Sequence, residues 1–156
     1  EYWILGDGVE RETFGQLAQQ LGVGDRVKFW GNLPRHQTLE RLSQSHVLVH
    51  PSLHDSGGWV CLEGMAAARP ILCLDLGGPS VQVDDETGIK VPAYNPKQTV
   101  RDLAEAMKRL AQDPDLRQRL GTAGRHKVHT QFNWEAKGRQ ISDLYDKIGS
   151  EAISNT

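Results

Sequence analysis

Short apolar runs alternate with helical patterns along this chain, and this alternation limits the folds that it can adopt. The runs predict strands at Tyr2–Leu5, Arg26–Trp30, His46–His50, Ile71–Leu74 and Ile89–Val91. Helical patterns lie between the strands, and three more helices follow the last strand. Strands that alternate with helices favour an α/β fold with a parallel, doubly wound (Rossmann-like) sheet that is covered on both faces.

Glycine clusters follow several of the predicted strands. They are Gly6 with Gly8, Gly31, Gly57 with Gly58, and Gly77 with Gly78. In parallel sheets of this kind, ligands bind beyond the carboxyl ends of the strands. We therefore expect all four clusters to gather along one edge of the sheet and to mark the ligand site.

Length and charge limit the number of domains and the classes of partner that we expect. The 156 residues suffice for one domain, which we expect over residues 1–149, with a frayed tail at 150–156. The 18 Lys and Arg nearly balance the 20 Asp and Glu, which gives no electrostatic case for a nucleic-acid partner. No apolar run approaches the roughly 18 residues of a membrane span. The chain opens within a strand, so we expect a piece of a longer protein. Cys61 and Cys73 are predicted to be reduced thiols.

The segment from Asp55 to Glu63 carries the main functional signal. It reads as a loop with a Gly57-Gly58 turn that leads directly into a helix. Free backbone N–H groups and the helix dipole favour a phosphate at such a helix N-terminus. A carboxylate further inside the helix can accept hydrogen bonds from sugar or ribose hydroxyls. Phosphate and polyol together indicate a sugar nucleotide.

Other patterns are weaker. Gly6-Asp7-Gly8 does not continue as a dinucleotide-binding motif, because Arg11 stands at the third glycine position. His50 and His54 straddle Pro51 and have no third ligand nearby, so we predict no metal site. On spacing alone, Asp55 can equally well be an ordinary loop or capping residue.

The same segment resembles a known family. Pro51-Ser52, an acidic residue, a glycine-rich turn and Leu62-Glu63-Gly64-Met65-Ala66 through Arg69-Pro70 are similar to the donor-binding motif of glycosyltransferase family 4, in which seven residues separate two glutamates. Further landmarks occur in the same order: Gly6-Asp7-Gly8, Val27 to Gly31, Gly77-Gly78, Thr87-Gly88 and Phe132-Asn133-Trp134. The resemblance implies most of the C-terminal, nucleotide-sugar-binding domain of a two-domain GT-B-type fold.

The resemblance also implies roles for particular residues. Glu63 would bind the ribose hydroxyls, and Asp55, the candidate catalytic residue, would orient the donor sugar rather than act as a general base. The diphosphate would lie against the backbone N–H groups of Ser56, Gly57, Gly58, Trp59 and Val60. Trp59 would flank the donor or seal the cleft, and the backbone of the loop with Leu33 would read the base. Transfer would proceed with retention and without a metal or other cofactor.

This chain departs from the family pattern at three places. Asp55 replaces the first glutamate and reaches roughly 1.5 Å less, Ser56-Gly57-Gly58 replaces a Gly-Phe-Gly type of sequence, and Val81 stands where many members have glutamate. The basic pair that neutralises the diphosphate in relatives, and the acceptor-binding domain, would lie upstream of Tyr2.

The sequence therefore predicts the donor-binding domain of a hexosyltransferase. UDP is the favoured nucleotide and GDP the next, with a saccharide or lipid acceptor in polysaccharide biosynthesis. We expect a cytoplasmic enzyme, with possible peripheral association of the full-length protein at the inner face of the membrane, and an inactive isolated fragment. Two alternatives stay open: another GT-B enzyme, such as a sugar-nucleotide epimerase or glucan synthase, and a degenerate interaction domain.

Overall fold

The computed structural model describes the backbone of residues 1–154 and the side chains of residues 1–149. The chain divides into two compact units, an N-terminal unit of residues 1–41 and a C-terminal unit from Leu42 onward. The prediction of one nucleotide-sugar-binding domain over residues 1–149 stays a prediction.

The N-terminal unit contains a two-stranded parallel sheet. Its elements are β1 (Tyr2–Leu5), α1 (Arg11–Gln20), a short 3₁₀ turn (Gly24–Arg26), β2 (Val27–Gly31) and the start of α2 (Arg35–Gln44). At the carboxyl ends of the two strands, Gly6 N donates a hydrogen bond to Gly31 O at 2.8 Å, so the first two glycine clusters meet within this unit. Phe14, Leu17 and Leu21 are spaced as on one face of a helix, but all three side chains are exposed.

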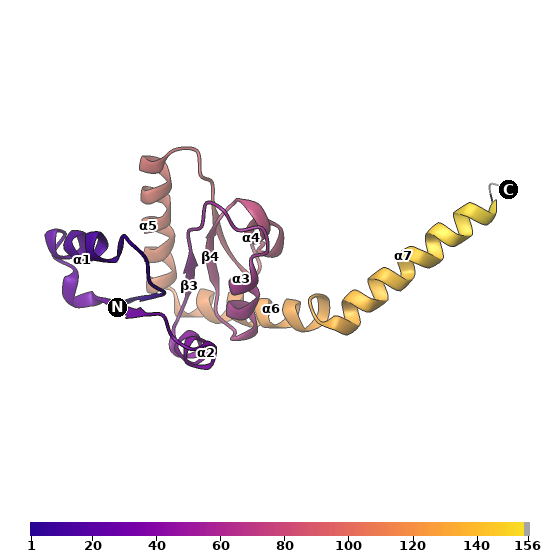
Figure 1. Cartoon of the computed structure of the whole chain (residues 1–156), viewed down its shortest axis with the longest axis horizontal. Coiled ribbons are helices and arrows are strands. Elements are labelled where there is room, and N and C mark those ends of the chain that lie inside the picture. Colours follow the sequence, from indigo (N-terminus) through magenta and orange to yellow (C-terminus); the bar gives the residue numbers. More distant parts are fainter. Residues whose placement is uncertain (155–156) are drawn as a thin grey trace. The chain divides into compact units, whose positions relative to one another are not determined.

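The C-terminal unit contains a three-stranded parallel sheet in the order β3–β4–β5. Figure 1 labels β3 and β4. Its elements are β3 (Leu48–His50), α3 (Trp59–Ala66), β4 (Ile71–Leu74), α4 (Gly77–Gln82), β5 (Gly88–Val91), α5 (Pro96–Gln112), α6 (Pro114–Gln131) and α7 (Trp134–Ser154). The long helices begin where their sequence dictates. Asn95 and Asp113 accept hydrogen bonds from Gln98 N and Leu116 N at 3.0 and 2.8 Å, and each cap is followed by proline.

The central strand β4 packs against helices on both faces. Its four residues are buried, as expected for a parallel strand between two layers. Ile71 and Cys73 face α3 and α4, where they form a cluster with Cys61, Met65 and Val83. Leu72 and Leu74 face α5 and α6, where they cluster with Val91, Ala106, Leu110, Leu116 and Leu120. Figure 1 shows α3 and α4 on one side of the strands and α5 on the other. The predicted parallel α/β fold with two covered faces is confirmed.

Several predicted boundaries need correction. The strand expected over His46–His50 covers only Leu48–His50 and is half-buried, and the helix expected after Gly57-Gly58 spans Trp59–Ala66. This helix cannot continue past Ala68, because Ala68 takes the left-handed conformation (φ 56°). The last helix begins after Asn133, whose Oδ1 accepts a hydrogen bond from Ala136 N at 2.7 Å. It runs through Ser154, so residues 150–154 are helical, whereas 155 and 156 lie outside the described residues.

Candidate nucleotide-sugar site

The Asp55–Gly58 segment lies in the loop that joins the carboxyl end of β3 to α3. His50 is the last residue of β3, and Trp59 is the first residue of α3. Parallel pairing of β3 with β4 directs this loop and the loop after β4 toward the same edge of the sheet. The segment that carries the sequence signal therefore lies at the edge of the sheet where parallel α/β folds generally bind ligands.

The Asp55 carboxylate is bound into its own loop. Oδ1 accepts hydrogen bonds from Gly57 N at 3.0 Å and from Gly58 N at 2.7 Å. Oδ2 lies 2.8 Å from His50 Nε2. The hydrogen bond from Gly58, followed by that from His50, lowers the pKa of Asp55. The carboxylate is therefore held ionised and fixed at the start of α3.

The glycine-rich loops after β3 and β4 pack directly on one another. Gly78 N donates to Asp55 O at 2.8 Å. A Cβ atom at Gly78 would lie 2.6 Å from Ser56 O, so any side chain there would push the two loops apart. Within the C-terminal unit, the prediction that these two glycine clusters gather at one edge is confirmed.

The first turn of α3 offers backbone donors. Cys61 N already donates to Gly58 O at 2.9 Å, but among the described residues no acceptor is bonded to the N–H groups of Trp59 and Val60. Both belong to the orphan donors of a helix N-terminus. Of the N–H groups predicted to contact a diphosphate, those of Gly57 and Gly58 thus bind Asp55, whereas those of Trp59 and Val60 are available.

Glu63 and Trp59 lie on α3 itself. Glu63 is half-buried just past the first turn, and the indole of Trp59 is 73% exposed. Leu33 belongs to the N-terminal unit, where it is half-buried and its carbonyl accepts from Thr38 Oγ1 at 3.4 Å. Within the described part of the chain, no group of three or more His, Cys, Asp and Glu side chains is arranged to hold a metal ion.

Two residues at this edge escaped the sequence interpretation. His50 appears in it only as a rejected metal ligand, but it binds the Asp55 carboxylate. Gln82, at the end of α4, reaches the loop and donates through Nε2 to Gly57 O at 2.5 Å. The sequence marks Gln82 only as a polar residue between two valines, Val81 and Val83.

Comparison with known proteins shows the family of this chain. The family model "Glycosyl transferases group 1" matches residues 1–127. A lipopolysaccharide core biosynthesis glycosyltransferase, LpsD of Rhizobium meliloti, is 35% identical over 146 residues, which are 93% of this chain and 41% of LpsD. An alpha-maltose-1-phosphate synthase of Mycolicibacterium smegmatis is 35% identical over 144 residues, 89% of this chain and 37% of that protein.

The backbone of this chain is also similar to that of a solved structure. The sucrose-phosphate synthase of Thermosynechococcus elongatus aligns with a TM-score of 0.76 at 32% identity, over 96% of this chain and 38% of that chain. This chain thus spans about two fifths of the length of these relatives. With a family model that covers most of its residues and an α/β fold shared with GT-B glycosyltransferases, the chain belongs to the group 1 glycosyl transferases.

Proposed function

We propose that this chain is the donor-binding, C-terminal domain of a retaining, metal-independent glycosyltransferase of family 4. The carrying observation is that the loop after β3 presents an ionised, fixed Asp55 carboxylate beside the available N–H groups of Trp59 and Val60. The proposed ligand is a nucleotide diphosphate sugar, with UDP favoured over GDP.

The contacts of the loop support a division of roles. A diphosphate carries negative charge, which the N–H groups and dipole at the start of α3 stabilise without a metal ion. These donors include Ser56 N, Trp59 N and Val60 N, whereas the N–H groups of Gly57 and Gly58 bind Asp55. Glu63, further along α3, accepts from the ribose hydroxyls, and the part of the Leu33 loop in reading the base stays a prediction from the resemblance.

Asp55 orients the donor sugar in this proposal. A carboxylate that holds two backbone N–H bonds and His50 has a low pKa, which suits an acceptor of sugar hydroxyl bonds better than a general base near pH 7. Its remaining lone pairs can take a sugar hydroxyl. This role agrees with transfer by retention, in which the donor sugar must be held rather than deprotonated.

The complete enzyme would transfer a hexose to a saccharide or lipid acceptor in polysaccharide biosynthesis. Transfer requires donor and acceptor to be held together, so this chain by itself should bind a nucleotide without catalysing transfer. We place the enzyme in the cytoplasm, with peripheral association at the inner membrane face when the acceptor is lipid-linked. Of the described helices, none combines the length and the apolar character that crossing a membrane requires.

Two other functions compete with this proposal. A sugar-nucleotide epimerase or a glucan synthase would use the same donor site, and product analysis with and without acceptor separates an epimerase from a transferase. A degenerate interaction domain is favoured by one observation, the capture of the Gly57 and Gly58 N–H groups by Asp55. That alternative predicts no nucleotide binding.

Calorimetric titration of the chain with UDP, GDP and ADP tests the proposal. We expect selective UDP binding, weakened about tenfold or more by Glu63→Ala through loss of a charged acceptor. Glu105→Ala on α5, an exposed carboxylate remote from the loop in sequence, is the matched control and should not change affinity. At 100 times Kd, UDP should stabilise the fold by about 2.7 kcal/mol. If neither this chain nor the full-length protein binds a nucleotide, the donor-domain proposal fails.

A further inference from the structure

Gln82 binds the peptide between Gly57 and Gly58 from the side opposite to Asp55. Its Nε2 donates to Gly57 O at 2.5 Å, while Gly58 N donates to Asp55 Oδ1 at 2.7 Å. We propose that Gln82 is a positioning residue, which acts through this peptide to hold the Asp55 carboxylate for the donor sugar. The donor sugar as ligand rests on the proposed function, whereas the hydrogen bonds of Gln82 and Asp55 to this peptide do not.

The planarity of the peptide bond is the physical link. Gly57 C=O and Gly58 N–H belong to one trans peptide and therefore point in opposite directions. A donor fixed on the carbonyl thus directs the N–H toward Asp55. Glycine on both sides makes the peptide easy to rotate, because glycine adopts backbone angles of either sign. Without Gln82, the carbonyl could turn toward Asp55, and two acceptors would then repel each other.

The surroundings of Gln82 hold it in this orientation. The residue is 92% buried, since only 8% of its surface is exposed. Gly57 O can only accept, so the side-chain amide must present Nε2 to it. Oε1 is buried without a hydrogen-bond partner and would lie 2.6 Å from a Cβ atom at Gly58. A buried oxygen without a hydrogen-bond partner costs free energy. The presence of Gln82 despite this cost fits a side chain whose Nε2 has a specific partner, Gly57 O.

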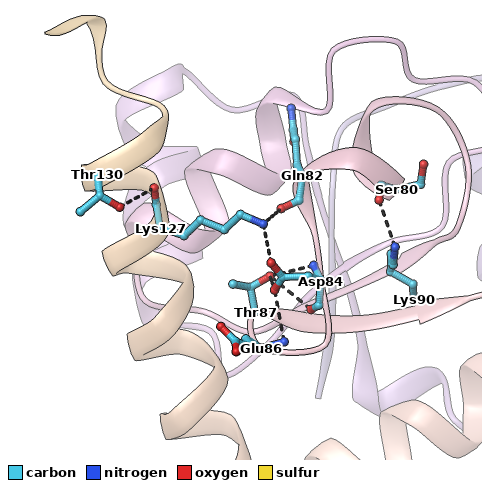
Figure 2. A network of polar contacts seen from close by, with 8 residues as sticks. All are labelled: Ser80, Gln82, Asp84, Glu86, Thr87, Lys90, Lys127 and Thr130. Atoms are coloured by element: carbon cyan, nitrogen blue, oxygen red, sulfur yellow. Dashed lines mark hydrogen bonds and ion pairs between the residues drawn. The ribbon is translucent and has the colours of Figure 1, made fainter. Parts of the chain in front are cut away.

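A second network fixes the backbone of Gln82. Lys127 Nζ, on α6, donates to Gln82 O at 2.8 Å and to Asp84 Oδ2 at 2.6 Å. Figure 2 shows the Gln82 side chain running away from this ammonium group. Lys127 therefore secures the main chain, and the amide is left to bind the loop. Gln82 is part of α4, so the loop after β4 supports the loop after β3.

The experiment measures the pKa of Asp55 by NMR of its carboxyl carbon in the ligand-free chain. In Gln82→Met, which keeps the length but cannot donate, the pKa should rise toward the ordinary value of about 3.9. Gln82→Glu places an acceptor against Gly57 O and should raise it as well. Val81→Ala, next to Gln82 and exposed, is the control and should leave it unchanged. In the unsubstituted chain, the Gly58 amide should exchange slowly with solvent, and this measurement needs no variant.

Binding gives an independent readout. UDP-glucose should bind Gln82→Met about tenfold more weakly, with UDP itself less affected, and thermal unfolding reports any general loss of stability. In an Asp55→Ala background, Gln82→Met should have no further effect if it acts through Asp55. An unchanged Asp55 pKa, a fast-exchanging Gly58 amide, or additive effects of the two substitutions would overturn the inference. If the unsubstituted chain binds no nucleotide, the proposed function fails, and the pKa and exchange data still decide the role of Gln82.

Discussion

Replacing Gly121 with alanine should destabilise the C-terminal unit, although alanine is the better helix former. Gly121 is buried on α6, and its added Cβ would lie 2.2 Å from Ala68 O and 2.8 Å from Ala68 C. These are main-chain atoms, so no side-chain rotation can relieve the overlap. The helices α3 and α6 must separate, or the turn at Ala68 must shift.

The matched substitution is Gly138→Ala on α7, where nothing lies within 4 Å of the added atom. Both changes gain helix propensity of about 1 kcal/mol. Overpacking costs roughly 1–3 kcal/mol, and a backbone overlap belongs near the upper end. We expect Gly121→Ala to lose about 1–2 kcal/mol net and Gly138→Ala to gain at most about 1 kcal/mol.

Thermal and urea unfolding followed by circular dichroism checks this difference. At roughly 2–4 °C per kcal/mol for a chain of this size, Gly121→Ala should melt about 2–8 °C below the unsubstituted chain. Equal melting temperatures for the two alanine variants would refute the close packing of α3 on α6. A lower stability of Gly138→Ala would instead contradict the open surroundings of α7.

Three further substitutions or conditions give measurable outcomes. Ala68→Gly should raise stability by up to about 1 kcal/mol, because glycine accepts the φ of 56° without strain; a lower Tm would contradict this. Burial raises the pKa of Cys61 to about 12 and that of Cys73 to about 11, so neither thiol should react with a thiol reagent until the protein unfolds. If the thiols of the folded protein react as fast as an exposed thiol, they are not buried. Burial raises the pKa of Asp84, but hydrogen bonds led by that from Lys127 outweigh it and lower the pKa. The resulting stabilisation is present above about pH 4 and is lost as the pH falls through the lowered folded value. Lys127→Met should flatten this acid dependence in urea unfolding, and an unchanged pH profile would exclude the contact.

The sequence by itself determined the order of elements and the class of fold. A short apolar run such as Ile71–Leu74, set between helical patterns, is typical of a parallel strand with helices on both faces, so the local pattern was enough to predict it. Caps at Asn95, Asp113 and Asn133 fixed helix starts through hydrogen bonds to residues three positions along the chain. The start of α3 was predictable from the Gly57-Gly58 turn before it, although its N-cap Gly58 provides no side-chain hydrogen bond. Interactions between residues that are close along the chain can be predicted from the local sequence.

Only the tertiary structure decided which residues from separate elements meet at the site and which hydrogen bonds they form there. His50 reaches the Asp55 carboxylate from the end of β3, and Gln82 reaches Gly57 O from the end of α4. The position of Ala68 against Gly121 is of the same kind. These contacts join residues up to 53 positions apart, the separation of Ala68 and Gly121, and no local periodicity records them. They exist because parallel strands bring separate loops to one edge, where each hydrogen bond depends on the packing of two elements.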